Sequence, residues 1–298
     1  MNMIKNIGLL GQYKNGNYQV KIFSDGTKIR STDEDSFRPD FSESMDLKIT
    51  NYCDMGCLYC HENSSKQGKH GNILNQSFIN SIHPHTEVAI GGGNPLSHPD
   101  LKEFLILLKE RNIVANITVN QNHFIEDFFL IKEFCDNGLI HGLGVSFIKY
   151  TKEFERLALL IPNLVLHVIN GVVDLTELEH LYGKNFKILI LGYKQIRRGK
   201  SFYSDTVKDN QKKIFEILSS MLNKFEVISF DNLAIEQLNV HRLMSKNQWD
   251  QFYMGDDGQY TFYVDLVDQK FARNSCESTR FDLWDSVYDM FNFIKINN

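Results

Sequence analysis

Three cysteines lie within eight residues of this chain, in the segment Cys53-Asp54-Met55-Gly56-Cys57-Leu58-Tyr59-Cys60. Three residues separate the first pair and two separate the second, so one short loop can turn all three thiolates toward a single metal centre. Thiolate is the soft ligand that zinc and iron–sulfur clusters prefer. The other two cysteines, Cys135 and Cys276, are distant in sequence and supply no nearby fourth ligand. The simplest interpretation is a four-iron cluster with one iron left open, and an open coordination position is typical of a reactive site.

This spacing, with the aromatic Tyr59 directly before the third cysteine, resembles the motif of the radical S-adenosylmethionine (radical SAM) superfamily. The resemblance implies that Cys53, Cys57 and Cys60 hold a [4Fe-4S] cluster, whose fourth iron is chelated by the amino and carboxylate groups of SAM. It also implies that the reduced cluster cleaves SAM to methionine and a 5′-deoxyadenosyl radical, which abstracts a hydrogen atom from a substrate.

A zinc-binding interaction module is the alternative from a different functional class. Its ion would be held by the three cysteines together with His61 or His70. An odd number of closely spaced cysteines favours metal binding over a disulfide framework. Because an iron–sulfur cluster needs a reducing interior, and because neither a signal peptide nor a membrane-length apolar run stands out, we expect a cytoplasmic protein without a membrane partner.

Composition narrows the class of protein further. The chain has 298 residues, of which 42% are hydrophobic, and this is enough for a large α/β core. The net charge is −5 and no long basic run is present, so the sequence carries no strong signal for nucleic-acid binding.

Short apolar strands alternate with helical segments from residue 47 onward. Six strands are expected, over residues 47–50, 87–90, 116–119, 143–147, 164–169 and 186–191. Among the helices between them, one is expected over residues 125–137, closed by Gly138. Repeated βα units predict a parallel sheet with right-handed crossovers. The family resemblance implies a partial (β/α)6 barrel of the TIM type over about residues 45–195, with the site at the C-terminal ends of the strands.

The remaining segments complete a predicted organisation into residues 1–40, 41–200 and 201–298. The first is predicted to be a β-rich extension, because alternating segments flank the turn at Asp25-Gly26. The second is the barrel core. The third is an α+β extension, with a long helix over 205–225, a further strand over 227–230, a hairpin over 258–273 and a docking helix over 281–294. Since Cys276 is the only cysteine of this extension, we expect it to lack an auxiliary cluster.

Glycine and polar residues follow several expected strands, where a cofactor would bind. Gly91-Gly92-Gly93-Asn94-Pro95 lies where the family carries Gly-Gly-Glu-Pro, whose backbone contacts the SAM amino group. Asn94 replaces the usual Glu, which preserves a backbone contact and removes any role of a carboxylate. The residues expected to bind the cofactor are Tyr59, Gly92, Gly93, Asn94, Asn120, Ser146 and Asn170. For the last three, capping of a loop is the alternative.

Other residues have weaker functional interpretations. A basic cluster after the sixth strand is formed by Lys194, Arg197, Arg198 and Lys200. It would pair with the SAM carboxylate or an anionic substrate, or remain solvated. Cys276 is a speculative catalytic residue, because some radical SAM peptide epimerases use a lone cysteine to return a hydrogen atom, although an inert thiol is favoured. Cys135 and His167 are interpreted as core residues.

The sequence therefore predicts a single-cluster radical SAM enzyme that abstracts hydrogen from a substrate. A peptide or protein substrate is favoured, since the C-terminal extension would dock a chain. A glycyl-radical activating enzyme and an enzyme that modifies a small molecule or nucleotide are the alternatives. The expected reductant is a flavodoxin or a ferredoxin.

Overall fold

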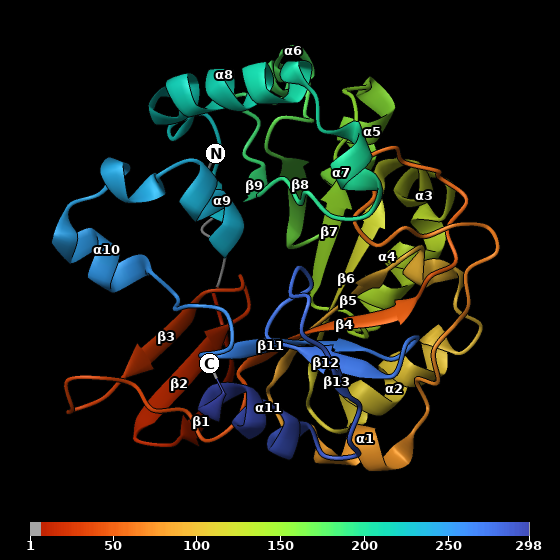
Figure 1. Ribbon diagram of the computed structural model, residues 1–298, viewed down its shortest axis with the longest axis vertical. Coiled ribbons are helices and arrows are strands. Elements are labelled where there is room, and N and C mark those ends of the chain that lie inside the picture. The colour runs from red at the N-terminus through yellow and green to blue at the C-terminus, as the bar shows by residue number, and fades with distance from the viewer. Residues whose placement is uncertain (1–6, 298) are drawn as a thin grey trace.

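A ten-stranded sheet is the centre of the molecule in the computed structural model, which describes residues 7–297. Residues 1–6 of the predicted N-terminal extension lie outside the described part. The strand order is β10-β9-β8-β7-β6-β5-β4-β11-β12-β13. The strands from β4 to β10 are parallel, and helices cover the outer face of the curved sheet (Figure 1). The predicted parallel α/β sheet is thus confirmed.

Seven parallel strands follow one another along the chain with helices between them. The strands are β4 (Ser44–Thr50), β5 (Glu87–Gly92), β6 (Val114–Asn120), β7 (Gly142–Ser146), β8 (Leu164–Ile169), β9 (Lys187–Leu191) and β10 (Val227–Phe230). The helices are α1 (Gln76–Ser81), η1 (Pro95–Ser97), α2 (Leu101–Glu110), α3 (Gln121–Glu126), α4 (Phe128–Asp136), α5 (Lys152–Ala158), α6 (Leu175–Glu179), α7 (Arg198–Phe202) and α8 (Asp205–Met221). Strand β10 is the expected further strand, whereas helix α1 was not predicted.

The parallel strands have two different faces because successive side chains point to opposite sides of a sheet. One set of alternate residues, such as Ile117, Val145 and Leu166, is buried under the helices. The intervening residues lie on the inner face. On β4–β7 they are small or polar, among them Asp46, Ala89, Gly91, Asn116, Thr118, Gly142, Gly144 and Ser146. On β8 and β9 the polar residues His167 and Lys187 share this face with Val165, Ile169, Leu189 and Leu191. The accessible, polar side of the sheet is therefore the side away from the helices.

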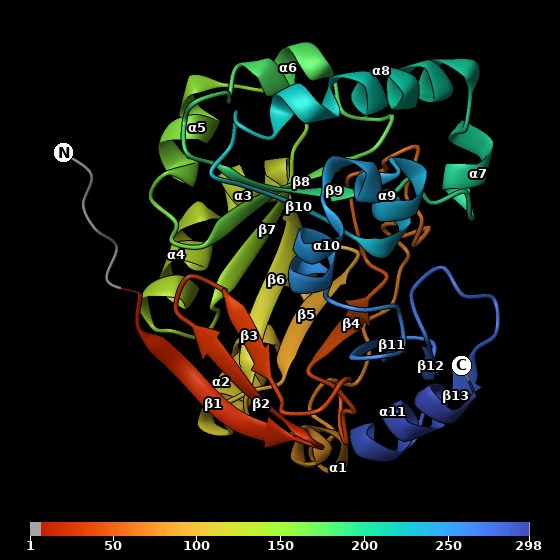
Figure 2. The same cartoon turned by 90° about the vertical axis from the view of Figure 1, so that its left-hand side faces the viewer.

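A small antiparallel sheet precedes the large one. Its strands are β1 (Leu9–Asn15), β2 (Tyr18–Phe23) and β3 (Lys28–Ser31), and it lies beside the lower ends of β4–β6 in Figure 2. The predicted hairpin is formed by β2 and β3, while β1 is an additional strand.

The C-terminal segment returns to the large sheet. Its elements are α9 (Asn232–Gln237), η2 (Val240–Leu243), α10 (Lys246–Phe252), β11 (Thr261–Asp265), β12 (Lys270–Ala272), β13 (Phe281–Asp282) and α11 (Val287–Ile296). Strands β11 and β12 form the expected hairpin, but β11 also pairs in parallel with β4. The predicted start of the last helix was wrong, because Phe281 and Asp282 form β13 and the helix is capped by Ser286.

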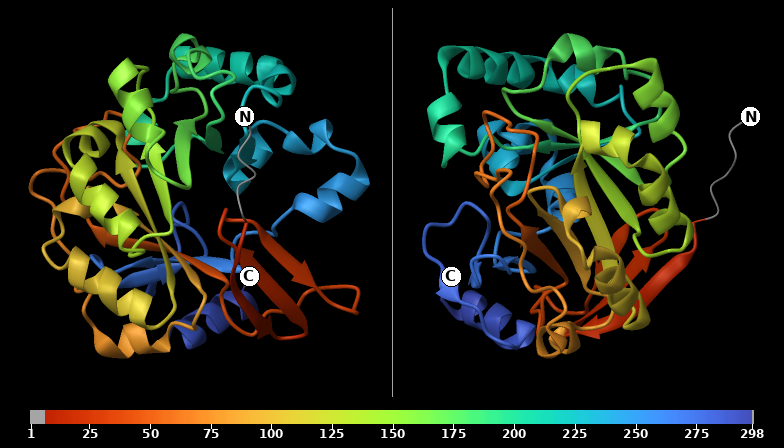
Figure 3. Two further views of the ribbon diagram at one scale, coloured as in Figure 1. Left: turned by 180° about the vertical axis from the view of Figure 1, so that it is seen from behind. Right: turned by 90° about the vertical axis from the view of Figure 1, so that its right-hand side faces the viewer.

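One hydrophobic core joins the large sheet, its helices and the C-terminal segment, and its buried residues extend from Met45 to Ile294. The small N-terminal sheet has a separate cluster, formed by Tyr13, Tyr18, Val20, Ile22 and Tyr260. The additional views of Figure 3 show the same layer of helices around the sheet from behind and from the right-hand side. Within residues 7–297, no helix combines the length and apolar composition that crossing a bilayer requires.

Candidate functional site

The three closely spaced cysteines lie in a loop that begins where β4 ends. The amide of Cys53 donates to the carbonyl of Ser65 over 2.9 Å, and the amide of Cys60 donates to the carbonyl of Cys57 over 3.2 Å. We call residues 53–65 the cysteine loop. All three thiols are free and partly buried. Burial raises the pKa of Cys53 and of Cys57, and the neighbouring thiols act in the same direction, which places the three sulfurs in one electrostatic neighbourhood.

The side chains of the cysteine loop do not close around one ion position in the described part of the chain. Among residues 7–297, no group of three or more His, Cys, Asp or Glu side chains surrounds one ion position. The zinc alternative requires its ligands to meet around one ion, whereas the cysteines of a four-iron cluster bind different iron atoms.

The glycine segment after β5 lies directly against the entrance of the cysteine loop. The amide of Gly93 donates to the carbonyl of Thr50 over 2.7 Å, and the amide of Asn94 donates to the carbonyl of Tyr52 over the same distance. A Cβ atom added to Gly93 would lie 2.0 Å from the Tyr52 carbonyl oxygen. Gly92 has a φ of 118°, a conformation that L-residues rarely adopt. The two chain segments predicted to bind the cluster and SAM are therefore adjacent.

The other residues expected to contact SAM have identifiable structural partners. The Asn94 and Asn120 side chains cap η1 and α3, accepting from Leu96 over 3.1 Å and from Asn122 over 2.9 Å. Asn170 donates to Gln237 over 3.0 Å. The two other predicted contacts are Tyr59, whose pKa burial raises to about 12, and Ser146 on the inner face. Their contacts with a cofactor stay predictions.

The start of the cysteine loop is attached to α3. His123 is 2% exposed, and its Nε2 lies 2.7 Å from Oδ1 of Asp54. The expected helix over 125–137 is in fact two helices, and α3 begins at Gln121, so His123 is turned toward the loop.

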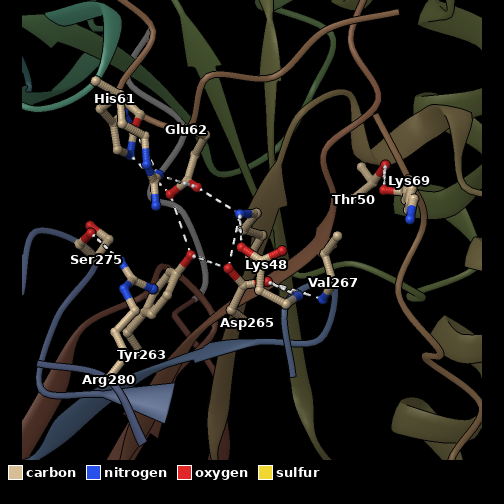
Figure 4. Close-up of polar contacts among 12 residues, drawn as sticks. Lys48, Thr50, His61, Glu62, Lys69, Tyr263, Asp265, Val267, Ser275 and Arg280 are labelled. Atoms are coloured by element: carbon tan, nitrogen blue, oxygen red, sulfur yellow. Dashed lines mark hydrogen bonds and ion pairs between the residues drawn. The ribbon is translucent and has the colours of Figure 1, made fainter. Parts of the chain in front are cut away.

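The end of the cysteine loop is attached through Glu62, which is 7% exposed (Figure 4). Its carboxylate lies 3.0 Å from Nζ of Lys48 on β4 and 3.1 Å from Nη1 of Arg197 before α7. It also accepts a hydrogen bond of 3.4 Å from the hydroxyl of Tyr263 on β11. Lys48 in turn contacts Asp265 on β11 over 2.9 Å.

Cations keep Glu62 ionised despite its burial. Burial acts to raise the pKa of Glu62, but hydrogen bonds from His61 and Lys48 and the charge of Lys48 outweigh it and hold the pKa well below its usual range. Burial and the Lys194 ammonium lower the pKa of His61 itself, so His61 is neutral at neutral pH. We therefore assign the stabilisation of this carboxylate to Lys48 and to Arg197, which contacts it directly.

The predicted basic cluster mostly holds the cysteine loop. Arg197 donates to the carbonyl of His61 over 2.8 Å, and Arg198 donates to the carbonyl of Ser64 over 2.5 Å. Lys194 donates to Ser275 over 2.8 Å, whereas Lys200 is exposed.

Four residues that fix the loop were not predicted from the sequence, namely Lys48, Glu62, His123 and Tyr263. The only local signal was a lysine within an apolar strand. The other contacts depend on pairing between distant segments of the chain.

Four titratable residues outside the loop bear on the inner face or on the predictions. Asp46 lies on the inner face, where its side chain can be reached by solvent. Protein atoms nevertheless surround its carboxyl group on several sides, and the resulting loss of hydration raises its pKa to about 6. The prediction of His167 as a core residue was wrong, because His167 is also partly accessible on this face. Burial lowers its pKa to about 4, so its imidazole is neutral at neutral pH. Cys276 is partly buried beside Ser275, and burial raises its pKa, so its thiol is protonated. The predicted core residue Cys135 packs against the hydrophobic core, partly buried.

Comparisons with known proteins identify the fold. No family model matches the sequence, and no curated protein matches it. The structure of Streptococcus suis SuiB bound to the precursor peptide SuiA has a TM-score of 0.57 and 14% identity, covering 87% of this chain and 67% of that chain. SuiB bound to S-adenosylmethionine has a TM-score of 0.54 and 13% identity, covering 82% and 64%. A third SuiB structure has a TM-score of 0.54 and 10% identity, covering 92% and 82%.

The chain thus spans about two thirds of the length of the first two SuiB structures. One of them was solved with SAM, the cofactor that the cysteine motif predicts. The chain therefore has the fold of SuiB.

Proposed function

We propose that this protein is a radical SAM enzyme that acts on a peptide or protein. One observation supports this proposal most strongly. A loop with the spacing of Cys53, Cys57 and Cys60 follows β4 of a parallel sheet, and the fold of this sheet is shared with SuiB, which was solved with SAM. In the proposal, the three cysteines hold a [4Fe-4S] cluster and SAM binds beside it.

The residues around the loop suit these two groups. Three free thiols in one loop form the donor set of a cluster with one open iron. Gly92 and Gly93 bring main chain against the loop entrance, where a side chain would collide with the Thr50 or Tyr52 carbonyl. Oδ1 of Asn170 is buried and lacks a hydrogen-bond partner within the described part of the chain, as expected of an acceptor that serves a ligand. When bound, the cluster and SAM would supply a 5′-deoxyadenosyl radical.

The inner face would bind and orient the substrate. Asp46 presents a carboxyl group there, and the neutral imidazole of His167 offers one donor and one acceptor. No hydrogen bond or ion pair within residues 7–297 occupies the imidazole of His167, so both ring nitrogens remain for a ligand. The protonated thiol of Cys276 is in the form that a hydrogen-atom donor needs, and this role stays a prediction.

A peptide substrate is supported by the SuiB structure that contains the precursor peptide SuiA. A glycyl-radical activating role and the modification of a small molecule or nucleotide are the alternatives within the same chemistry. A flavodoxin or ferredoxin as reductant and a cytoplasmic location belong to the same proposal.

The direct test is anaerobic reconstitution with iron and sulfide, followed by incubation with dithionite and SAM. We expect a brown protein that forms 5′-deoxyadenosine. Replacing Cys57 with Ala should abolish both the cluster and the cleavage, because the cluster then loses one of its three protein ligands.

The matched control is Cys135→Ala, which removes a thiol on α4 that packs against the core. This variant should retain the iron and the cleavage. The proposal is refuted if the wild-type protein binds zinc in place of the cluster, or if Cys57→Ala keeps both properties.

A further inference from the structure

The buried carboxylate of Glu62 connects the cysteine loop to three separate elements. It lies two residues after Cys60, and its partners are Lys48 at 3.0 Å, Arg197 at 3.1 Å and Tyr263 at 3.4 Å. These residues belong to β4, to the segment before α7 and to β11. Figure 4 shows Glu62 reaching from the loop toward Lys48 and Tyr263.

Strand β11 fixes the positions of Lys48 and Tyr263 through Asp265. Oδ2 of Asp265 lies 2.9 Å from Lys48 and 3.5 Å from the Tyr263 hydroxyl. Oδ1 of Asp265 accepts from the amides of Val267 and Asp268 over 3.0 and 2.9 Å, which fixes the carboxylate on its own turn. Lys48 is therefore held between the cysteine loop and the C-terminal segment.

Burial makes this arrangement rigid. The side chains of Lys48, Glu62 and Asp265 are 2%, 6% and 0% exposed. Removing one partner of such a network leaves the others buried and uncompensated. The lowest free energy therefore belongs to one arrangement of the loop, in which Glu62 lies between Lys48 and Arg197.

We propose that Glu62 is the positioning residue of the cysteine loop, and that β11 controls it through Lys48 and Tyr263. The C-terminal segment would then be part of the cluster site, although it is about 200 residues away in sequence. The statement about the loop rests on its contacts alone, whereas its consequence for a [4Fe-4S] cluster rests on the proposed function.

The first experiment uses the metal-free full chain and measures amide hydrogen exchange by mass spectrometry. Glu62→Ala should accelerate exchange in residues 53–65, and Tyr263→Phe should do so to a smaller extent, because it removes only one hydroxyl. Asp268→Ala is the matched control, since its carboxylate lies 3.9 Å from the same lysine but is 57% exposed. Unchanged exchange of residues 53–65 in Glu62→Ala overturns the proposal.

The second experiment uses the reconstituted protein and measures iron content and the midpoint potential of the cluster. Glu62→Gln keeps the size of the side chain and removes one negative charge, so the potential should rise while iron content is largely kept. A residue that only maintained the fold would leave the potential unchanged. Glu62→Ala should lower the iron content, and wild-type values in both variants would refute the role at the cluster.

The two experiments separate the two claims. If the wild-type chain accepts no cluster, the proposed function fails, and exchange in the metal-free chain still decides whether Glu62 positions the loop. Should Glu62→Ala fail to fold, exchange in Glu62→Gln and in Tyr263→Phe decides the same question.

Discussion

At the scale of single residues, two glycines at the end of β5 differ in the side chains that their surroundings allow. A Cβ atom at Gly93 would lie 2.0 Å from the Tyr52 carbonyl oxygen, whereas a Cβ atom at Gly91 would meet no atom within 4 Å. Gly93→Ala should therefore lower the free energy of unfolding by about 1–3 kcal/mol, because backbone must shift to accept the methyl group. Gly91→Ala should stay within about 0.5 kcal/mol of wild type. Guanidinium unfolding of the two variants checks this, and equal stability would contradict the close contact between the glycine segment and the loop.

The inner-face carboxyl Asp46 predicts a pH dependence of stability. Burial raises its pKa to about 6, so the folded state holds this proton more tightly than the unfolded chain does. The tighter binding of this proton stabilises the folded state fully below the ordinary carboxyl pKa of about 4, and this stabilisation is lost as pH rises through about 6. Asp46→Asn should therefore stabilise the protein more at about pH 8 than at about pH 5, by no more than about 1 kcal/mol since the side chain is solvent-accessible.

Thermal unfolding of Asp46→Asn at both pH values measures the effect, with the exposed Asp250→Asn on α10 as control. A gain that is equal at the two pH values would show that the carboxyl is not enclosed. The expected gain means that wild type keeps a destabilising carboxyl on the accessible face, which is typical of functional residues.

At the scale of elements, local patterns predicted the strands and missed the contacts between them. The run of βα units identified all six expected strands, because alternation of apolar segments with helices is a local property. The sequence also identified the cysteine loop and the glycine segment, since each is a short continuous motif. The start of α3 was missed because Asn120 caps it directly at the end of β6, and this hid His123 as a partner of the loop.

Pairing between distant elements could not be predicted in the same way. Strand β11 pairs with β12 in an antiparallel hairpin, which local sequence patterns can predict. No local pattern shows that the opposite edge of β11 pairs with β4. The contacts of Glu62 with Lys48 and Tyr263 depend on that pairing. The register places Tyr263 opposite Asp46 and Asp265 opposite Lys48, so both contacts of Glu62 come from adjacent strands. A charged residue in an apolar strand indicates that a partner exists and leaves its identity open.

At the scale of the whole molecule, the C-terminal segment is built into the large sheet and its core. Residues Thr261–Asp265 of β11 pair with Ser44–Lys48 of β4, and the core cluster includes residues of both. The small N-terminal sheet is attached at the same place, where the buried Glu43 accepts from Arg30 over 2.8 Å. The residues of the large sheet and the C-terminal segment share one sheet and one core, so these two parts should unfold together.

Both tryptophans, Trp249 and Trp284, lie in the C-terminal segment, so their fluorescence reports on that segment while far-UV circular dichroism reports on the whole chain. We expect the two signals to give coincident guanidinium transitions, because β11 cannot leave the sheet without exposing the edge of β4. Phe262→Ala on β11 removes a side chain that is 1% exposed and should lower both midpoints together, by about 3–5 kcal/mol in free energy. Phe252→Ala on α10, where the side chain is 59% exposed, should leave both midpoints nearly unchanged. A fluorescence transition that precedes the loss of circular dichroism would make residues 201–298 a separate folding unit, and β11 would then be a detachable strand beside the cysteine loop.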